Sequence, residues 1–228
     1  AYMFGAAALK PIAKMSSLKV IQSPNAGVDD VIALRPAGVT LCNAAGVHDA
    51  STAELAVGLA IAARRGFAQF AKDQSAGKWS HTTYASLTDS KVAIVGHGNI
   101  GKTIAGMLAG FEVAITSFSK SGADGALKMD KFDALLHTFD VIILIVPLNS
   151  ETRHLMNSNR LAAMKDGAAL INVARGAVVD TDALLQELQT GRISAGLDVT
   201  DPEPLPAGHP LWSAPNTFIT PHVGGDSR

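Results

Sequence analysis

The sequence contains a single cysteine, Cys42, among its 228 residues. One cysteine can form neither an intrachain disulfide nor a metal cage built from several thiolates. No histidine can be assigned to Cys42 as a catalytic partner, so we interpret it as a buried, inert thiol. Five histidines also lack the spacing of a metal site, and we therefore expect no metal. They are His48, His81, His137, His154 and His209.

Long apolar runs and an excess of charge are missing as well. The longest uninterrupted aliphatic run, VIILIV at residues 141–146, is far shorter than a membrane-spanning helix. Lysine and arginine total 19 against 20 aspartates and glutamates, so the net charge of −1 provides no basic surface. No secretory signal peptide is visible. We expect a cytoplasmic protein that binds small molecules and neither nucleic acid nor membrane.

What the sequence does contain is an alternation of apolar strands and helices. With 47% hydrophobic residues, the chain can bury a large core. The candidate strands KVAIVG, VIILIVP and AALINVA are continuous apolar runs, typical of a parallel sheet covered on both faces. We predict a doubly wound α/β domain of the Rossmann type over residues 49–222. Residues 1–48 are predicted to be part of a second, smaller α/β domain.

Some helices have recognisable signals at their ends. Residues 49–70 are predicted as one long buried helix that begins with a capping box of Ser51 and Glu54. Residues 129–140 are predicted as another helix. A helix within residues 180–191 is expected to have Asp180 or Thr181 as its N-cap and Gly191 just beyond its end.

Gly96, Gly98 and Gly101 form a G-x-G-x-x-G motif in VAIVGHGNIGKTIAG. The motif follows an apolar strand and opens a helix, which is the context in which it binds a dinucleotide. Gly96 allows the tight turn, Gly98 lets the backbone approach a pyrophosphate, and Gly101 allows the helix to pack closely on the strand. The backbone N–H groups of Asn99 and Ile100 are expected to face the anion. The alternative is that the glycines serve packing alone.

The end of the following strand bears on the choice between NAD and NADP. A site that prefers NAD usually has an acidic residue about 20 positions after the glycine motif. The sequence has hydroxyl groups and a cation there instead, which suit a 2′-phosphate. We predict that NADP(H) is preferred and NAD(H) possible, with contacts from Ser119, Lys120 and Ser121. The alternative is that Lys120 is a solvated lysine of a loop.

Four ionisable side chains follow the ends of the later strands. They are Arg175 after AALINVA, Asp198 in ISAGLDV with Glu203 soon after it, and His222 after NTFITP. In an open parallel sheet, ligands bind beyond the carboxyl ends of the strands. We therefore expect these side chains to converge at the edge where the glycine loop also lies.

Their chemistry matches the reduction of a carbonyl group, because a nicotinamide moves only a hydride and a proton must come from elsewhere. His222 can supply that proton near neutral pH. Glu203, held in the stiff stretch DPEPLP, is expected to favour the imidazolium and to fix the ring. Arg175 offers a planar fork for a substrate carboxylate and a donor for the developing alkoxide.

The chain resembles the D-isomer-specific 2-hydroxyacid dehydrogenases in SPNAGVDD, CNAAGVHDASTAEL, VGHGNIGK, VPLNSETRHLMN, NVARGAVVDTDAL, GLDVTDPEPLP and ITPHVGG. The resemblance covers nearly the whole chain. It implies a flavodoxin-like substrate domain that is incomplete here, because family members carry further strands before this segment and a helix after HVGG. It also implies that residues 223–228 begin the return of the chain to that domain. It also implies that Arg175, Glu203 and His222 are the catalytic triad.

Further roles follow from the resemblance. Asp198 would bind the nicotinamide carboxamide, and the backbone of Ala26 and Gly27 would bind the substrate carboxylate. The residues expected to line the cofactor cleft are Val146, Pro147, Thr152, Val173, Ala174 and Gly224.

The stretch AITSFSKSG looks most like the NADPH-using hydroxypyruvate and glyoxylate reductase branch of the family. We therefore expect the reduction of a small 2-oxo acid to a D-2-hydroxy acid, by a homodimer formed through the dinucleotide-binding domain. Two alternatives stay open. One is a dinucleotide-sensing binding protein such as a corepressor, and the other is an activity like that of formate or phosphoglycerate dehydrogenases.

Overall fold

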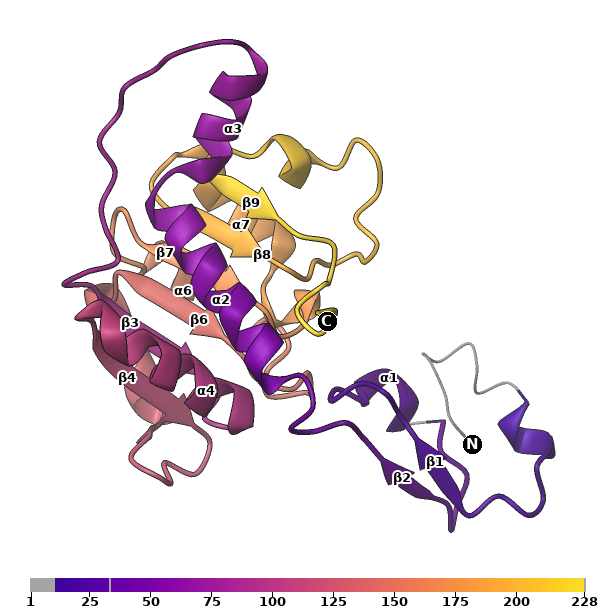
Figure 1. Ribbon diagram of the computed structural model, residues 1–228. Coiled ribbons are helices and arrows are strands. Elements are labelled where there is room, and N and C mark those ends of the chain that lie inside the picture. The colour runs from indigo at the N-terminus through magenta and orange to yellow at the C-terminus, as the bar shows by residue number, and fades with distance from the viewer. Residues whose placement is uncertain (1–10, 33, 228) are drawn as a thin grey trace.

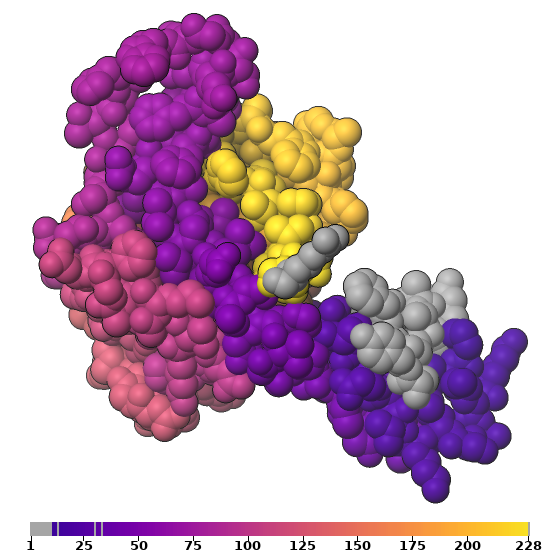
Figure 2. All heavy atoms as spheres, in the orientation of Figure 1, coloured from indigo at the N-terminus to yellow at the C-terminus, as the bar shows by residue number. Residues whose placement is uncertain are grey.

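The computed structural model describes residues 11–32 and 34–227, which form a small unit joined to a larger one (Figure 1). Figure 2 shows the small unit projecting from the larger one. It contains the 3-10 turn Ile12–Lys14, β1 (Val20–Gln22), α1 (Asp29–Ile32) and β2 (Thr40–Cys42). β1 and β2 pair in parallel, and a small core lies between them and α1, made of Ile12, Ile21, Val31 and Val39. The domain limits drawn from the sequence stay a prediction.

The larger unit is built on a seven-stranded sheet in which every pairing is parallel. The strand order is β5-β4-β3-β6-β7-β8-β9, so the direction of winding reverses between β3 and β6. This confirms the predicted doubly wound fold, and the glycine motif, which directly follows β3, lies at its switch point. The strands are β3 (Lys91–Val95), β4 (Ala114–Ser119), β5 (Leu127–Lys128), β6 (Val141–Leu144), β7 (Ala169–Asn172), β8 (Ser194–Leu197) and β9 (Thr217–Ile219).

Helices cover both faces of this sheet, which explains why its strands are apolar throughout. Successive residues of a strand point to opposite faces. Thus Ile143 packs on the face covered by α2 (Asp49–Arg64) and α4 (Asn99–Leu108). Its neighbour Ile142 packs on the face covered by α5 (Phe132–Leu135), α6 (Ser158–Ala162) and α7 (Thr181–Gln189).

The helix predicted over residues 49–70 is interrupted. α2 ends at Arg64, Gly66 has a left-handed backbone with φ of 67°, and α3 (Phe67–Ser75) continues from there. The predicted capping box was also wrong. His48 is the N-cap of α2 without a side-chain hydrogen bond, and the Ser51 hydroxyl donates to the His48 carbonyl instead.

Other helix predictions had mixed outcomes. Residues 129–140 contain only α5 between two short 3-10 turns, Met129–Lys131 and Leu136–Thr138, in place of one helix. The N-cap at Asp180 is confirmed, because its carboxylate accepts a hydrogen bond from the Ala183 amide at 3.1 Å. Gly191 follows the end of α7 with φ of 73°, as predicted. Among the described residues, no helix has the length and apolar character needed to cross a membrane.

Candidate active site

A cleft of about 870 Å³ lies between the carboxyl ends of the central strands and the small unit. This volume falls within the usual range of small-molecule sites. Its walls include Ala26 and Gly27 from the small unit and Gly98–Gly101 from the glycine loop. The loops that follow β6 to β9 contribute Val146, Pro147, Val173, Ala174, Arg175, Asp198, His222 and Gly224. The structure therefore brings together most of the residues selected from the sequence.

The glycine loop has the close approaches that a dinucleotide-binding turn requires. Gly96 has φ of 116°, and a Cβ atom there would lie 2.1 Å from the Ile145 carbonyl oxygen. A Cβ atom on Gly101 would lie 2.0 Å from the Gly96 carbonyl oxygen. Gly98 is different, because no atom would lie within 4 Å of its Cβ and it faces the open cleft. Gly98 is also the N-cap of the ten-residue α4, and it leaves the helix's first N–H groups without a side-chain cap. The loop therefore fits a pyrophosphate.

The turn after β4 is arranged differently from the sequence prediction. Lys120 Nζ lies 2.6 and 2.7 Å from the two carboxylate oxygens of Glu151, in the loop after β6. The Ser119 hydroxyl accepts a hydrogen bond from the Gly122 amide, and the Ser121 hydroxyl accepts one from the Ala123 amide. Lys120 is therefore engaged with Glu151 and does not stand free, as the sequence prediction assumed.

Thr152 belongs to the loop after β6 but does not line the cleft. Its hydroxyl donates to the Pro147 carbonyl at 2.6 Å and accepts a hydrogen bond from the Asn149 amide at 2.9 Å. Both bonds close the loop on itself. The structure therefore gives Thr152 a role in shaping the loop that presents Val146 and Pro147 to the cleft.

His222 and Glu203 are paired, as the sequence analysis predicted. His222 Nδ1 lies 2.5 Å from Glu203 Oε1. This hydrogen bond raises the pKa of His222, and the negative charges of Glu203 and Asp198 act in the same direction against partial burial and the charge of Arg175. The same hydrogen bond lowers the pKa of Glu203. Because Nδ1 faces Glu203, Nε2 is the ring nitrogen left for a substrate.

Asp198 holds the turn that carries His222. Its buried carboxylate accepts hydrogen bonds from the Thr220 hydroxyl at 2.6 Å and from the Val223 and Gly224 amides at 2.9 Å. Its carbonyl oxygen accepts a bond from the His222 amide at 2.8 Å. His222 itself has φ of 55°, a left-handed conformation that is uncommon for residues other than glycine. These bonds stabilise that conformation.

Arg175 follows β7 and is fixed by neighbours that the sequence analysis did not identify. Asn172 Nδ2 donates to the Arg175 carbonyl at 2.9 Å, which shapes the backbone after the strand. Nη1 of Arg175 donates to the Ala174 carbonyl at 2.7 Å, and Nε pairs with Asp29 of α1 at 3.0 Å. Asp29 stands in SPNAGVDD, the stretch in which only Ala26 and Gly27 were given a role. Within residues 11–32 and 34–227, no group of three His, Cys, Asp or Glu side chains could hold a metal ion.

A glycine loop at the switch point of a doubly wound sheet, facing a histidine–glutamate pair and an arginine, defines a dinucleotide-dependent oxidoreductase. The family model "D-isomer specific 2-hydroxyacid dehydrogenase, NAD binding domain" matches residues 57–224, which is more than half of the chain. The chain therefore belongs to the D-isomer specific 2-hydroxyacid dehydrogenases, oxidoreductases that use NAD or NADP.

Similar proteins differ in the substrates that their names give. Hydroxypyruvate reductase of Thermotoga maritima is 34% identical over 221 residues, covering 92% of this chain and 72% of that protein. D-3-phosphoglycerate dehydrogenase of Archaeoglobus fulgidus is 33% identical over 222 residues, covering 93% of this chain and 42% of that protein. A similar crystal structure is that of an NADPH-dependent glyoxylate/hydroxypyruvate reductase from Sinorhizobium meliloti, in complex with NADP and malonate. It superposes with a TM-score of 0.84 at 32% identity, covering 92% of this chain and 69% of that chain.

Proposed function

We propose that this protein reduces a small 2-oxo acid, of the size of glyoxylate or hydroxypyruvate, to the D-2-hydroxy acid. The observation that supports this most directly is that His222, hydrogen-bonded to Glu203, lines the same cleft as Arg175 and the glycine loop. A nicotinamide dinucleotide with its pyrophosphate at Gly98–Gly101 would supply the hydride for reduction and accept it in the reverse direction.

The protein's own part in the reaction is to provide a proton and to hold the acid. Glu203 keeps Nδ1 of His222 occupied, so the imidazolium presents its Nε2 proton to the carbonyl oxygen. Arg175 is placed to bind the carboxylate of the substrate, together with the backbone of Ala26 and Gly27. The guanidinium also stabilises the oxygen on which negative charge develops.

The charges of the cleft favour a substrate with a single negative charge. Of the cleft residues in the described part of the chain, Arg175 is the only lysine or arginine. Four aspartates line the same walls, namely Asp29, Asp49, Asp198 and Asp226. A phosphorylated acid would bring about 1.5 to 2 further negative charges and would meet net repulsion. This supports a simple 2-oxo acid over phosphohydroxypyruvate.

We further propose that NADPH is preferred over NADH. The last residues of β4 include no carboxylate that would bind a free 2′-hydroxyl and repel a phosphate. Lys120 follows directly and becomes available once it leaves Glu151. The S. meliloti reductase, whose structure contains NADP, is consistent with this choice.

A steady-state screen of the full-length protein tests the proposal. Glyoxylate, hydroxypyruvate, pyruvate, longer 2-oxo acids and phosphohydroxypyruvate are each assayed with NADPH and NADH by nicotinamide absorbance. We expect the highest kcat/KM for a two- or three-carbon acid without phosphate, and a loss of roughly 10²–10⁴-fold in rate for His222→Ala. Cofactor binding without turnover of any acid would identify a dinucleotide-sensing protein instead.

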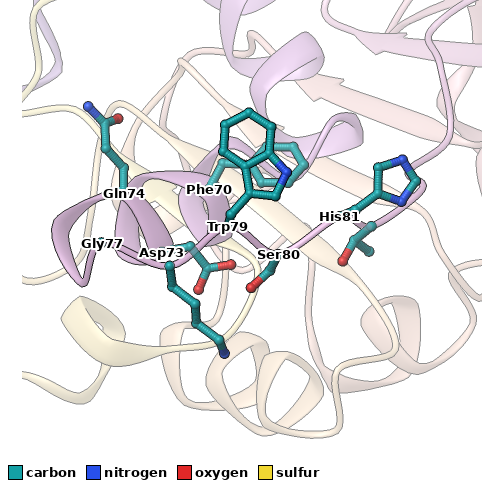
Figure 3. A pocket seen from close by; sticks show the side chains of 9 residues that line it. Phe70, Asp73, Gln74, Gly77, Trp79, Ser80 and His81 are labelled. Atoms are coloured by element: carbon teal, nitrogen blue, oxygen red, sulfur yellow. The ribbon is translucent and has the colours of Figure 1, made fainter.

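We also propose that the protein self-associates through α3 and the segment after it. A hollow of about 520 Å³ lies there, away from the catalytic residues, and Phe70, Asp73 and Trp79 contribute to its lining (Figure 3). The Trp79 side chain is 98% exposed, and Phe67 and Phe70 are also exposed. Exposed aromatic groups of this size are typical of contact surfaces. A second copy of the chain would cover them, as expected for a homodimer formed through the dinucleotide-binding domain.

A further inference from the structure

Each nitrogen atom of the Arg175 guanidinium has a different neighbour. Nε donates to both carboxylate oxygens of Asp29, at 3.0 and 3.2 Å. Nη1 donates to the Ala174 carbonyl at 2.7 Å. Nη2 has no hydrogen-bond partner within the described residues, and it lies against Gly27, where an added Cβ atom would fall 1.5 Å from it. Two of the three nitrogens are therefore held, and the third faces the cleft beside the backbone of Gly27.

The pair of Asp29 and Arg175 joins the two units of the molecule. Asp29 belongs to α1 of the small unit, whereas Arg175 follows β7 of the large one, 146 positions later in the sequence. The side chains are only 27% and 28% exposed. Solvent and salt therefore screen this pair less than the exposed ion pairs of the surface.

We propose that Asp29 is a positioning residue for the reaction, which acts through Arg175. By holding Nε, it keeps the guanidinium plane turned so that Nη2 points to the backbone of Ala26 and Gly27, where the substrate carboxylate binds. The inference rests on the proposed function and deepens it.

Arginine has five N–H donors in a fixed planar fork, so fixing Nε fixes the direction of the others. Without Asp29, only the bond from Nη1 to the Ala174 carbonyl restrains the fork within the described part of the chain. The guanidinium plane can then turn about that contact, and each binding event has to order it again. The small unit also loses its ion pair to the arginine. Substrate binding should weaken, whereas the hydrogen bond between His222 and Glu203 is left in place.

The test compares the full-length protein with Asp29→Asn, Asp29→Ala and a control, Asp49→Asn. Asp49 begins α2 and lines the same cleft, so its replacement removes the same charge without touching Arg175. For Asp29→Ala we expect KM for the preferred 2-oxo acid to rise about tenfold or more. The rise for Asp29→Asn should be smaller, because an amide oxygen still accepts from Nε. The affinity for NADPH, measured by fluorescence, and the pH profile of kcat should stay close to the parent.

A double-mutant cycle then separates positioning from a general loss of structure. In an Arg175→Lys background there is no Nε to hold, so Asp29→Asn should raise KM little further. Thermal melting shows whether a variant has lost its fold. If Asp29→Ala is unfolded, KM is compared for Asp29→Asn instead, because asparagine keeps the shape of the side chain.

Three results would overturn the inference. One is a lower KM in the Asp29 variants, which would mean that Asp29 competes with the substrate for Arg175. Another is an equal rise in Asp49→Asn, which would mean that changing any carboxylate of the cleft weakens binding, whether or not it contacts Arg175. The third is a full, multiplicative effect of Asp29→Asn in the Arg175→Lys background.

Oxalate binding, measured by calorimetry with NADPH present, provides the second readout. If the parent turns over no 2-oxo acid, the proposed function fails, yet weaker oxalate binding by Asp29→Ala would still support the role of Asp29. If the parent neither turns over a 2-oxo acid nor binds oxalate, both proposals are wrong.

Discussion

Replacing Glu151 by glutamine tests whether this residue restrains Lys120 from binding the cofactor. In the structure Lys120 is bound to both carboxylate oxygens of Glu151. The two side chains are 82% and 61% exposed, so the pair lies largely in solvent. Glutamine keeps the length of the side chain and removes its charge. The change should therefore free Lys120 for a 2′-phosphate without altering the loop.

The magnitudes decide which partner Lys120 prefers. An exposed ion pair of this kind contributes about 0.2–1 kcal/mol. A 2′-phosphate carries a charge of about −1.5 to −2 at pH 7, against −1 for Glu151, so its attraction for the ammonium is up to about twice as strong. Lys120 should therefore move from Glu151 to the phosphate, at a cost of up to about 1 kcal/mol. A cost of that size corresponds to roughly a fivefold factor in kcat/KM.

The assay is the ratio of kcat/KM with NADPH to that with NADH. We expect the parent to prefer NADPH by up to about two powers of ten. Glu151→Gln should raise the ratio about two- to fivefold, more at low salt than at high salt. Lys120→Ala should abolish most of the preference, and in that background Glu151→Gln should have no effect. Lys165→Ala is the control, because Lys165 pairs with Asp140 at 2.6 Å near the amino ends of β6 and β7, at the opposite ends of the strands from the turn of Lys120. A parent that prefers NADH, or an unchanged ratio in Lys120→Ala, would refute the role of Lys120.

Three further predictions concern the catalytic residues and the assembly. Glu203→Gln should lower the pKa of His222. The fall of kcat/KM for reduction at high pH then moves to lower pH, and oxidation, which needs the neutral imidazole, extends to lower pH. Identical pH profiles in the parent and the variant would exclude Glu203 from this role. Arg175→Lys keeps the charge but loses the fork, so KM should rise and kcat should fall, each about tenfold or more; parental kinetics would place the carboxylate elsewhere. Trp79→Ser should shift the protein from dimer to monomer in sedimentation velocity, and a monomeric parent would contradict the proposed interface.

The fold could be predicted from the sequence where one local signal agreed with the tertiary structure. The apolar runs of β3, β6 and β7 indicated a sheet buried on both faces, and Asp180 was recognisable as a helix cap. The break between α2 and α3 could not be predicted from helix propensity. At Gly66, an added Cβ would lie 2.2 Å from the Tyr84 ring, so packing against a distant residue fixes this turn.

The active site was likewise predictable in part. The convergence of Arg175 and His222 followed from the rule that parallel strands end at one edge of a sheet. The pairing of Lys120 with Glu151 joins residues 31 positions apart, and that of Arg175 with Asp29 joins residues 146 apart. No spacing in the sequence signals such pairs, because each depends on how two loops or two units come together.

Asp198 shows how the core of the sheet is linked to the proton donor. It ends an apolar strand, where an unpaired carboxylate would be costly to bury, and its oxygens are instead satisfied by the turn of Thr220, Val223 and Gly224. The turn has to adopt the geometry that these bonds require, and that geometry includes the left-handed backbone of His222. The ring is thereby directed to Glu203, and the negative charge of Asp198 also raises the pKa of the imidazole. The same buried carboxylate therefore fixes the position of the catalytic histidine and adds a smaller contribution to its raised pKa, which comes mainly from the hydrogen bond to Glu203.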